Sequence, residues 1–394
     1  MQDSFVTIDI LCKVVDNYGD IGVVYRLAKA LSDLDPALRI RLVVDELSAF
    51  HALAPGLDPA KDVQDYHGWT VIRWDHPWEG FKREPPRLVL ECFACGRPDY
   101  FESCLFDPAF GSTAHIINVE HLSAEAWADE LHLMPSLTRS ARVKKWIFMP
   151  GFTHETGGLI IDRRFEEAAA RWNGARADAE ALASMRSGLA DASSLGLEKG
   201  AERRYWLSVF SYERDYGPIV ADIAAFSRER PVLALLASGK SQPCFLSAWE
   251  RAGRPFPVLR LPFLPQEAWD ELLLACDFNI VRGEETLARA ALSGRPFIWQ
   301  AYLQAEAHQL VKVRAFLKRL EPWLDAPSFA AFSNATLAFN ERDRDDGAWL
   351  GAESILPPLR ASEAAERGFS AFSRSLSMNG DLALHLLTFL RDLV

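Results

Sequence analysis

Two aspartates bracket a short polar turn near the start of the chain, in the stretch VDNYGDIGVVYRLAKAL. The turn comes after an apolar run and before a helical pattern, so Asp16 and Asp20 stand at the kind of strand-to-helix turn where ligands of open α/β sheets bind. Asn17, Tyr18 and Gly19 lie between them, and the glycine allows a close backbone turn. One alternative is that Asp20 only caps the helix, because aspartate is a preferred N-cap residue. Capping does not explain the residues beside it.

A second turn, VRGEETLARAALSGRP, carries groups that suit a phosphate. Arg282 can pair with a phosphate through two parallel hydrogen bonds. Gly283, Glu284, Glu285 and Thr286 open a helix whose N–H groups attract anions. The alternative is that both glutamates are ordinary first-turn acids, which the helix dipole favours. If a diphosphate binds here, at least one carboxylate must face hydroxyls or solvent, because both would repel it.

A third segment, RLPFLPQEAWDELL, pairs an aromatic ring with an amide, Phe263 and Gln266. A ring can stack on a nucleobase, and an amide can bind its edge. The alternative for Phe263 is simple core packing, which is the common fate of a single phenylalanine.

Two apparent metal motifs do not meet the requirements of a metal site. CFAC, at 92–95, has zinc-like spacing without a second pair, and HETGGL, from residue 154, lacks the second histidine of a metalloprotease helix. The six cysteines are too scattered for a disulfide framework. We therefore expect reduced thiols, no metal and no other cofactor. The aspartate turn also lacks the G-x-G-x-x-G pattern, which argues against a dehydrogenase.

Strands and helices alternate along the chain, and this alternation predicts parallel sheets covered by helices. Apolar runs predict strands at 5–15, 39–46, 69–74, 87–93 and 115–121, and again at 205–213, 232–237, 258–264, 278–283 and 296–300. After the first strand, Val24, Leu27, Ala28 and Leu31 form a helical stripe. Ligands of such sheets bind at the carboxyl ends of the strands, where all three turns fall.

A chain of 394 residues exceeds the usual size of a single core, so we expect two α/β domains. We place the first at 1–153 and the second at 154–379, with an apolar helix at 380–394 that crosses back to the first. A Gly- and Pro-containing crossover leads into an Ala-rich stretch at 164–190 that we expect to be helical. The alternative for this segment is an ordinary surface loop and helix.

The formal net charge of −11 argues against a nucleic-acid partner, because phosphate neutralisation needs a basic face. No signal pattern and no apolar run of about 20 residues is present, so we expect a cytoplasmic protein with no membrane contact.

Six long phrases occur in order over nearly the whole chain: DNYGDIGVVYRLAKAL, CFACGRPDYF, NVEHLSAEAWADELHLMPS, KKWIFMPGFTHETGGLI, LPFLPQ and RGEETLARAALSGRPFIWQAYLQAEAHQ. Together they resemble the bacterial protein-arginine rhamnosyltransferases that modify translation elongation factor P. The resemblance implies a GT-B type glycosyltransferase, with two Rossmann-like domains that face a cleft. The implied donor is dTDP-β-L-rhamnose, held by the C-terminal domain. The implied acceptor is an arginine of elongation factor P, held by the N-terminal domain and modified with inversion at the anomeric carbon.

The resemblance also implies roles for individual residues. Asp20 matches the catalytic aspartate, with Asp16 as its companion and Glu284 able to share the task. Asn17, Tyr18 and Gly19 would line the donor sugar. The other donor-binding positions are Tyr212, Phe263, Gln266, Arg282, Gly283, Glu284, Glu285 and Thr286.

The chemistry of arginine agrees with such an assignment. A guanidinium has a pKa above about 12 and is a poor nucleophile, so a carboxylate must hold it and accept a proton. Two other classes of function remain open. One is a dTDP-sugar epimerase, which needs no protein acceptor. The other is a non-catalytic nucleotide-sugar-binding protein, in which the aspartates are only caps.

Overall fold

The computed structural model describes residues 6–15, 18–302, 304, 307–341, 354–361 and 363–393. The chain forms two compact units, an N-terminal unit of Met1–Ile160 with Asn379–Val394, and a C-terminal unit of Ile161–Met378. The expected boundary after residue 153 lies too early. The N–H of Gly157 still donates to the carbonyl of Met149 at 2.8 Å, and Leu159 pairs with Asp381. These bonds hold the segment in the N-terminal unit.

The described residues of the N-terminal unit form one sheet of eight strands in the order β3-β4-β2-β1-β5-β6-β8-β7. The bounds are β1 (Thr7–Cys12), β2 (Arg39–Val44), β3 (Val63–Tyr66), β4 (Trp69–Arg73), β5 (Leu88–Cys92), β6 (Ala114–Val119), β7 (Pro135–Ser136) and β8 (Val143–Phe148). Only the edge strands β3 and β7 pair antiparallel. The strand order reverses between β1 and β5, and α/β proteins bind ligands outside the carboxyl ends at such a switch point.

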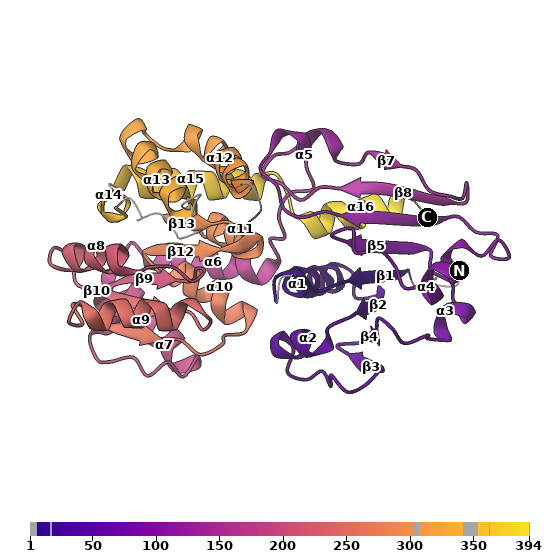
Figure 1. Cartoon of the computed structure of the whole chain (residues 1–394), viewed down its shortest axis with the longest axis horizontal. Helices are drawn as coiled ribbons and strands as arrows, with labels where there is room; N and C mark the ends of the chain where they lie inside the picture. The colour runs from indigo at the N-terminus through magenta and orange to yellow at the C-terminus, as the bar shows by residue number, and fades with distance from the viewer. Residues whose placement is uncertain are drawn as a thin grey trace. The chain divides into compact units, whose positions relative to one another are not determined.

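The helices of this unit are α1 (Gly19–Leu34), α2 (Leu47–Leu53), α3 (Gly80–Arg83), α4 (Asp99–Phe106), α5 (Ala126–Leu131) and α16 (Leu382–Asp392). The predicted stripe on α1 is confirmed, because Val24, Leu27, Ala28 and Leu31 are all buried. Figure 1 shows α16 in yellow among the purple elements of this unit, where its apolar face shares one core with β1 and α1.

The C-terminal unit has a five-stranded sheet in the order β11-β10-β9-β12-β13, with every pair parallel. Its strands are β9 (Tyr205–Val209), β10 (Val232–Leu236), β11 (Val258–Arg260), β12 (Phe278–Arg282) and β13 (Phe297–Gln300). Its helices are α6 (Arg163–Ala175), α7 (Ala179–Ala192), α8 (Gly217–Ser227), α9 (Ser241–Arg251), α10 (Gln266–Ala275), α11 (Gly283–Ser293), α12 (Gln309–Leu320), α13 (Ala326–Asn340), α14 (Leu356–Leu359) and α15 (Glu363–Met378), with short 3₁₀ turns η1 (Ala201–Arg203) and η3 (Glu321–Trp323). The switch point here lies between β9 and β12.

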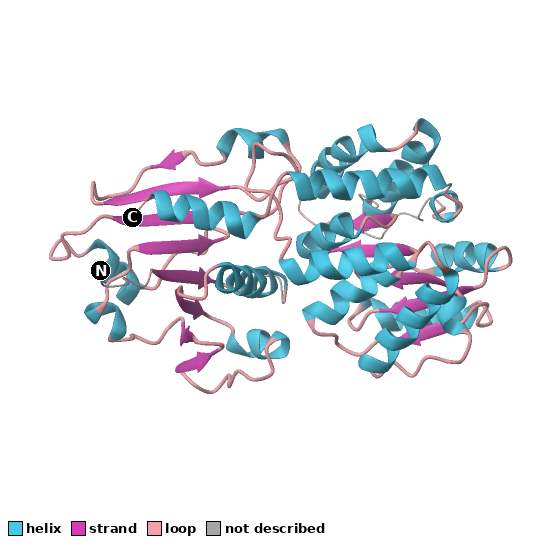
Figure 2. Cartoon of the chain, turned by 180° about the vertical axis from the view of Figure 1, so that it is seen from behind, coloured by secondary structure: helices cyan, strands magenta, loops and turns pink. Residues whose placement is uncertain are grey.

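The predicted alternation of strands and helices is confirmed in both units, and Figure 2 shows each sheet as a layer of magenta arrows covered by cyan helices. The stretch at 164–190 is helical, as predicted, and forms the two helices α6 and α7. The second helix starts anew at Asp178, whose side chain accepts from the N–H groups of Glu180 and Ala181.

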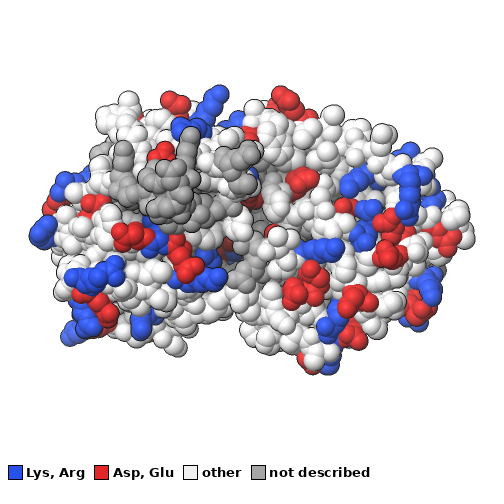
Figure 3. Space-filling model, in the orientation of Figure 1, with Lys and Arg blue, Asp and Glu red and all other residues white. Residues whose placement is uncertain are grey.

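The surface mixes both charge signs. Figure 3 shows blue and red side chains interspersed over the described residues of the face in view. Within the described part of the chain, no helix has the length and apolar character that crossing a membrane requires.

Candidate functional site

Asp20 lies at the switch point of the N-terminal sheet, in the first turn of α1 and directly beyond the carboxyl end of β1. It is buried, with 7% of its surface exposed, and its Oδ2 accepts a 2.7 Å hydrogen bond from the N–H of Val15. The N-cap of α1 is Tyr18, without a side-chain cap. The alternative that Asp20 is only a helix cap is therefore wrong. Its carboxylate instead accepts a hydrogen bond from Val15, in the turn that precedes the helix.

The charge of Asp20 contributes to the raised pKa values of two cysteines, one at the end of each strand that borders the switch point. Burial, together with neighbouring thiols and Asp20, raises the pKa of Cys12 at the end of β1 well above its ordinary value. Burial, Cys95, Glu91 and Asp20 do the same to the pKa of Cys92 at the end of β5. A buried carboxylate between two parallel strand ends is well placed to receive a cationic ligand.

Asp16 and Asn17 lie outside the described residues, so their roles remain predictions. Tyr18 is 39% exposed, and Gly19 is the first residue of α1.

Residues at and just beyond the carboxyl ends of β5 and β6 form a polar and aromatic cluster that the sequence did not predict. Phe93 and Ala94 have φ angles of 58° and 50°, a region that side-chain-bearing residues seldom occupy and that is common at functional sites. The Phe93 ring stacks on His121 with centroids 4.3 Å apart, and Asn118 Oδ1 accepts from the N–H of Ala94 at 3.0 Å. The signal was present in CFAC and NVEH, since each lies at the carboxyl end of an apolar strand.

Arg282 ends β12 on the switch point of the C-terminal sheet. Its guanidinium lies over two rings, 4.5 Å from the centroid of Phe210 and 4.7 Å from that of Tyr212. Its Nη1 is 3.5 Å from the carbonyl oxygen of Ser211. Such stacking holds a cation in a fixed place while leaving N–H groups at its edge for an anion.

The N-terminus of α11 begins directly after Arg282. Gly283 has a φ of 66°, which favours glycine, and its carbonyl accepts from Trp299 Nε1 at 2.8 Å. Glu284 forms a 2.8 Å ion pair with Lys312, so a cation already offsets its charge. Glu285 belongs to the same first turn, and Thr286 is buried. The turn can thus accept an anion despite its acids.

Tyr212 follows β9, across the switch point from Arg282. Its N–H donates to Oε1 of the buried Gln300 at 2.9 Å, and its ring lies edge-on to Tyr302 at 5.9 Å. Gln300, at the end of β13, is a positioning residue that the sequence reasoning missed.

Phe263 and Gln266 follow β11, on the same carboxyl edge of the C-terminal sheet but two strands away from β9. Phe263 is 47% exposed, so the core-packing alternative is wrong. Gln266 is the first residue of α10 and is buried. An exposed ring can stack on a planar group.

Within the ranges that the structure describes, no three His, Cys, Asp or Glu side chains come together as a metal site. In CFAC, burial and the charge of Glu91 raise the pKa of Cys95 to about 12. All six cysteines are free.

Comparisons with known proteins agree with one another. The family model described as elongation factor P (EF-P) rhamnosyltransferase EarP matches residues 8–391. A protein-arginine rhamnosyltransferase of Pseudomonas aeruginosa is 33% identical over 98% of this chain and 98% of its own. One of Pseudomonas putida is 36% identical over 90% of this chain and 92% of its own.

A solved structure, described as the structural basis for EarP-mediated arginine glycosylation of translation elongation factor EF-P, shares the fold. The TM-score is 0.60 at 23% identity, and the match covers 98% of this chain and 99% of that one. The expected fold class, two Rossmann-like domains of the GT-B type, is confirmed.

Proposed function

Because the chain belongs to the elongation factor P rhamnosyltransferase family and is a protein-arginine rhamnosyltransferase, we propose that it moves L-rhamnose from dTDP-β-L-rhamnose to an arginine of EF-P. The observation that carries the proposal is the family match over residues 8–391, which includes both switch-point sites. EF-P acts on the ribosome, so we also propose that the enzyme works in the cytoplasm. Modified EF-P would relieve ribosomes stalled at consecutive prolines.

Asp20 is the proposed general base. The acceptor guanidinium must lose a proton as its nitrogen bonds to the anomeric carbon, because its pKa is above about 12. A buried carboxylate, held by the N–H of Val15, can bind the cation and then take that proton. Asp16 is proposed to orient the acceptor or to support Asp20, and Asn17, Tyr18 and Gly19 to line the sugar.

The donor is proposed to bind at the C-terminal switch point. As the new C–N bond forms, the bond from the anomeric carbon to the diphosphate oxygen breaks, and dTDP leaves with both electrons. Arg282 and the N–H groups at 283–286 would stabilise that charge, because they are fixed before the reaction. Phe263 and Gln266 would hold the base, and Tyr212 would help to hold the diphosphate. Glu284 and Glu285 would meet sugar hydroxyls.

A single displacement inverts the anomeric carbon, so the product would be an α-rhamnosyl arginine. No metal is part of this scheme, because Arg282 and the helix N-terminus supply the positive charge that the leaving group needs. Whether Asp20 is the sole base, or shares the task with Asp16 or Glu284, is decided by separate substitution of each.

The reaction class can be tested by following the anomeric protons of dTDP-rhamnose by NMR, with and without EF-P. The transferase proposal predicts that the donor is consumed only when EF-P is present and that an α-linked product appears. Change of the donor in the absence of acceptor would instead indicate an epimerase. Binding of the donor with no consumption at all would indicate a non-catalytic nucleotide-sugar-binding protein.

A further inference from the structure

The C-terminal unit contains a pocket at the edge of the sheet opposite to the proposed donor site. Its volume is about 450 Å³. Arg230 lies just before β10, Asp277 just before β12 and Arg295 just before β13. The pocket therefore opens at the amino ends of the parallel strands, whereas Arg282 and Tyr212 lie at the carboxyl ends.

Positive charge exceeds negative charge in this pocket. Its charged lining residues are Arg176, Arg230, Arg295, Arg374, Asp277 and Glu366. Arg176 shares Asp277 with the buried Arg186: its Nη1 lies 3.0 Å from Oδ1 of Asp277, and Nη2 of Arg186 lies 2.8 Å from Oδ2. In the part of the chain that the structure describes, the other three arginines make no ion pair.

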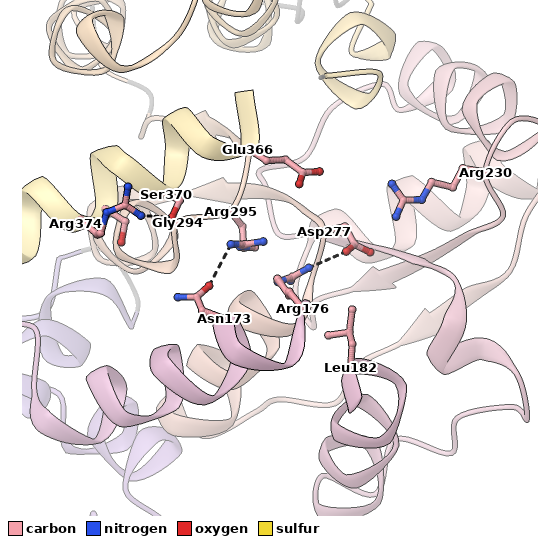
Figure 4. A pocket seen from close by; sticks show the side chains of 11 residues that line it. Asn173, Arg176, Leu182, Arg230, Asp277, Gly294, Arg295, Glu366, Ser370 and Arg374 are labelled. Atoms are coloured by element: carbon pink, nitrogen blue, oxygen red, sulfur yellow. Dashed lines mark hydrogen bonds and ion pairs between the residues drawn. The ribbon is translucent and has the colours of Figure 1, made fainter. Parts of the chain in front are cut away.

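Each of those three arginines is held by a neutral group instead. Arg230 lies over the ring of Tyr205 at 4.7 Å, Arg295 donates to Asn173 Oδ1 at 3.2 Å, and Arg374 donates to Ser370 Oγ at 2.8 Å. Figure 4 shows Arg295 and Arg176 in the middle of the pocket, with Arg374 and Arg230 to either side.

Two buried donors in the pocket lack an acceptor. The Nε atoms of Arg176 and Arg295 are buried and make no hydrogen bond within the described structure. Burial, followed by the charge of Arg176, lowers the pKa of Arg295 to about 9. Buried donors are normally satisfied, and adjacent like charges are costly, so an anion in the pocket would offset the repulsion between these arginines.

We propose that this pocket is a second ligand site, which binds a small anion carrying phosphate groups. Guanidinium forks from several directions match phosphate oxygens, and a volume of about 450 Å³ fits a small molecule. The site also has a structural consequence. Asn173 lies on α6 and Ser370 on α15, the helices next to the two points where the chain passes between the units. A bound anion joins those two helices.

Inorganic pyrophosphate is the probe, titrated by calorimetry into the full-length protein with dTDP present at saturation. The saturating dTDP occupies the proposed donor site, so the remaining binding reports the pocket. The double variant R230Q/R374Q removes two exposed arginines, and we expect at least tenfold weaker binding of pyrophosphate. Glu366→Gln removes an opposing charge and should tighten binding about two- to fivefold.

The matched control is Arg367→Gln, an exposed arginine on the same helix as Arg374 that does not line the pocket. It should leave pyrophosphate affinity unchanged. Unaltered thermal melting of each variant without ligand establishes that the fold is intact.

Three results would overturn the proposal: no pyrophosphate binding in the presence of dTDP, binding that R230Q/R374Q leaves unchanged, or binding that Arg367→Gln weakens equally. The measurement uses no acceptor and no turnover. Its outcome therefore tests the pocket independently of the proposed reaction.

Discussion

The backbone N–H of Val15 donates a 2.7 Å hydrogen bond to Oδ2 of Asp20, across the turn that joins β1 to α1. The same carboxylate lies at the switch point of the N-terminal sheet, where it is the proposed base. Asp20 therefore has a structural contact and a proposed chemical role. Two substitutions separate them, because asparagine keeps an oxygen acceptor whereas alanine does not.

Asp20→Asn should fold like the wild type and bind dTDP with affinity within about twofold, but its turnover should fall by about 10²- to 10⁴-fold, because the amide cannot take a proton. Asp20→Ala should lose turnover as well and about 1 kcal/mol of unfolding free energy, because the N–H of Val15 loses its partner. Single-turnover kinetics and urea unfolding measure the two effects. Wild-type turnover in Asp20→Asn would exclude Asp20 as the base.

Arg282→Ala should weaken dTDP binding by about 10- to 100-fold, the loss of a charge-assisted contact to phosphate. It should leave EF-P binding unchanged, since the acceptor is proposed to bind the N-terminal unit. Calorimetry with dTDP and with EF-P measures both. Arg254→Ala is the control. Among the described residues this exposed arginine, which follows the end of α9, forms an ion pair only with Glu250 and lies over the ring of Trp249. Unchanged dTDP affinity in Arg282→Ala would remove Arg282 from the donor site.

The N-terminal sheet contains a buried ion pair and an exposed one, from arginines two residues apart on β2. Arg41 binds both oxygens of the buried Asp9 at 2.6 Å, whereas Arg39 pairs with Glu84 at 2.9 Å on the surface. Arg41→Leu should lower the unfolding free energy by about 3–5 kcal/mol, because Asp9 is left as an uncompensated buried acid.

The matched variant Arg39→Leu should change the unfolding free energy by no more than about 1 kcal/mol, since exposed pairs contribute little. Denaturant titration of both variants measures the contrast. Equal losses in the two variants would show that the burial of Asp9 does not determine the stability of the sheet.

His132 should make the protein less stable in mild acid. Burial and the nearby His385 lower its pKa to about 4, and its Nδ1 accepts the N–H of Met149 at 3.2 Å, which requires a neutral ring. The unfolded histidine titrates near 6.5. Between pH 6.5 and 4 the unfolded state binds the extra proton, so the unfolding free energy falls as the pH is lowered through this window.

The control for His132 is His132→Asn, which keeps an acceptor without the titration. Wild-type protein should lose about 1–2 kcal/mol more unfolding free energy than the variant between pH 6.5 and pH 4, a modest figure because the ring is partly exposed. Parallel pH dependences for the two proteins would contradict this assignment.

The sequence predicted most strands of the two sheets, because the apolar runs become buried strands and the helical stripes become the buried faces of helices. Three strands, β3, β7 and β8, were not predicted. In β8, Lys144 and Lys145 interrupt the apolar run, and β3 and β7 are short edge strands with one hydrogen-bonded side. The break between α6 and α7 depends on a single residue, the N-cap Asp178, and an Ala-rich composition on both sides gives no sign of it.

The site residues were found where a motif marked a strand end, as with Asp20 and Arg282. Residues that act through tertiary contacts were missed. Lys312 is distant in sequence from Glu284, and His121 from Phe93, so only the fold brings each pair together. The left-handed backbone at Phe93 and Ala94 could not be predicted either, because phenylalanine and alanine ordinarily adopt negative φ angles.

The intact mass of EF-P after incubation with this protein and dTDP-β-L-rhamnose shows whether rhamnose is transferred. We expect a gain of one deoxyhexosyl group, located on a single arginine by fragmentation and abolished when that arginine is replaced by lysine. No gain of mass, on an EF-P that carries the acceptor arginine and with the donor shown to be intact, would contradict the proposed transfer.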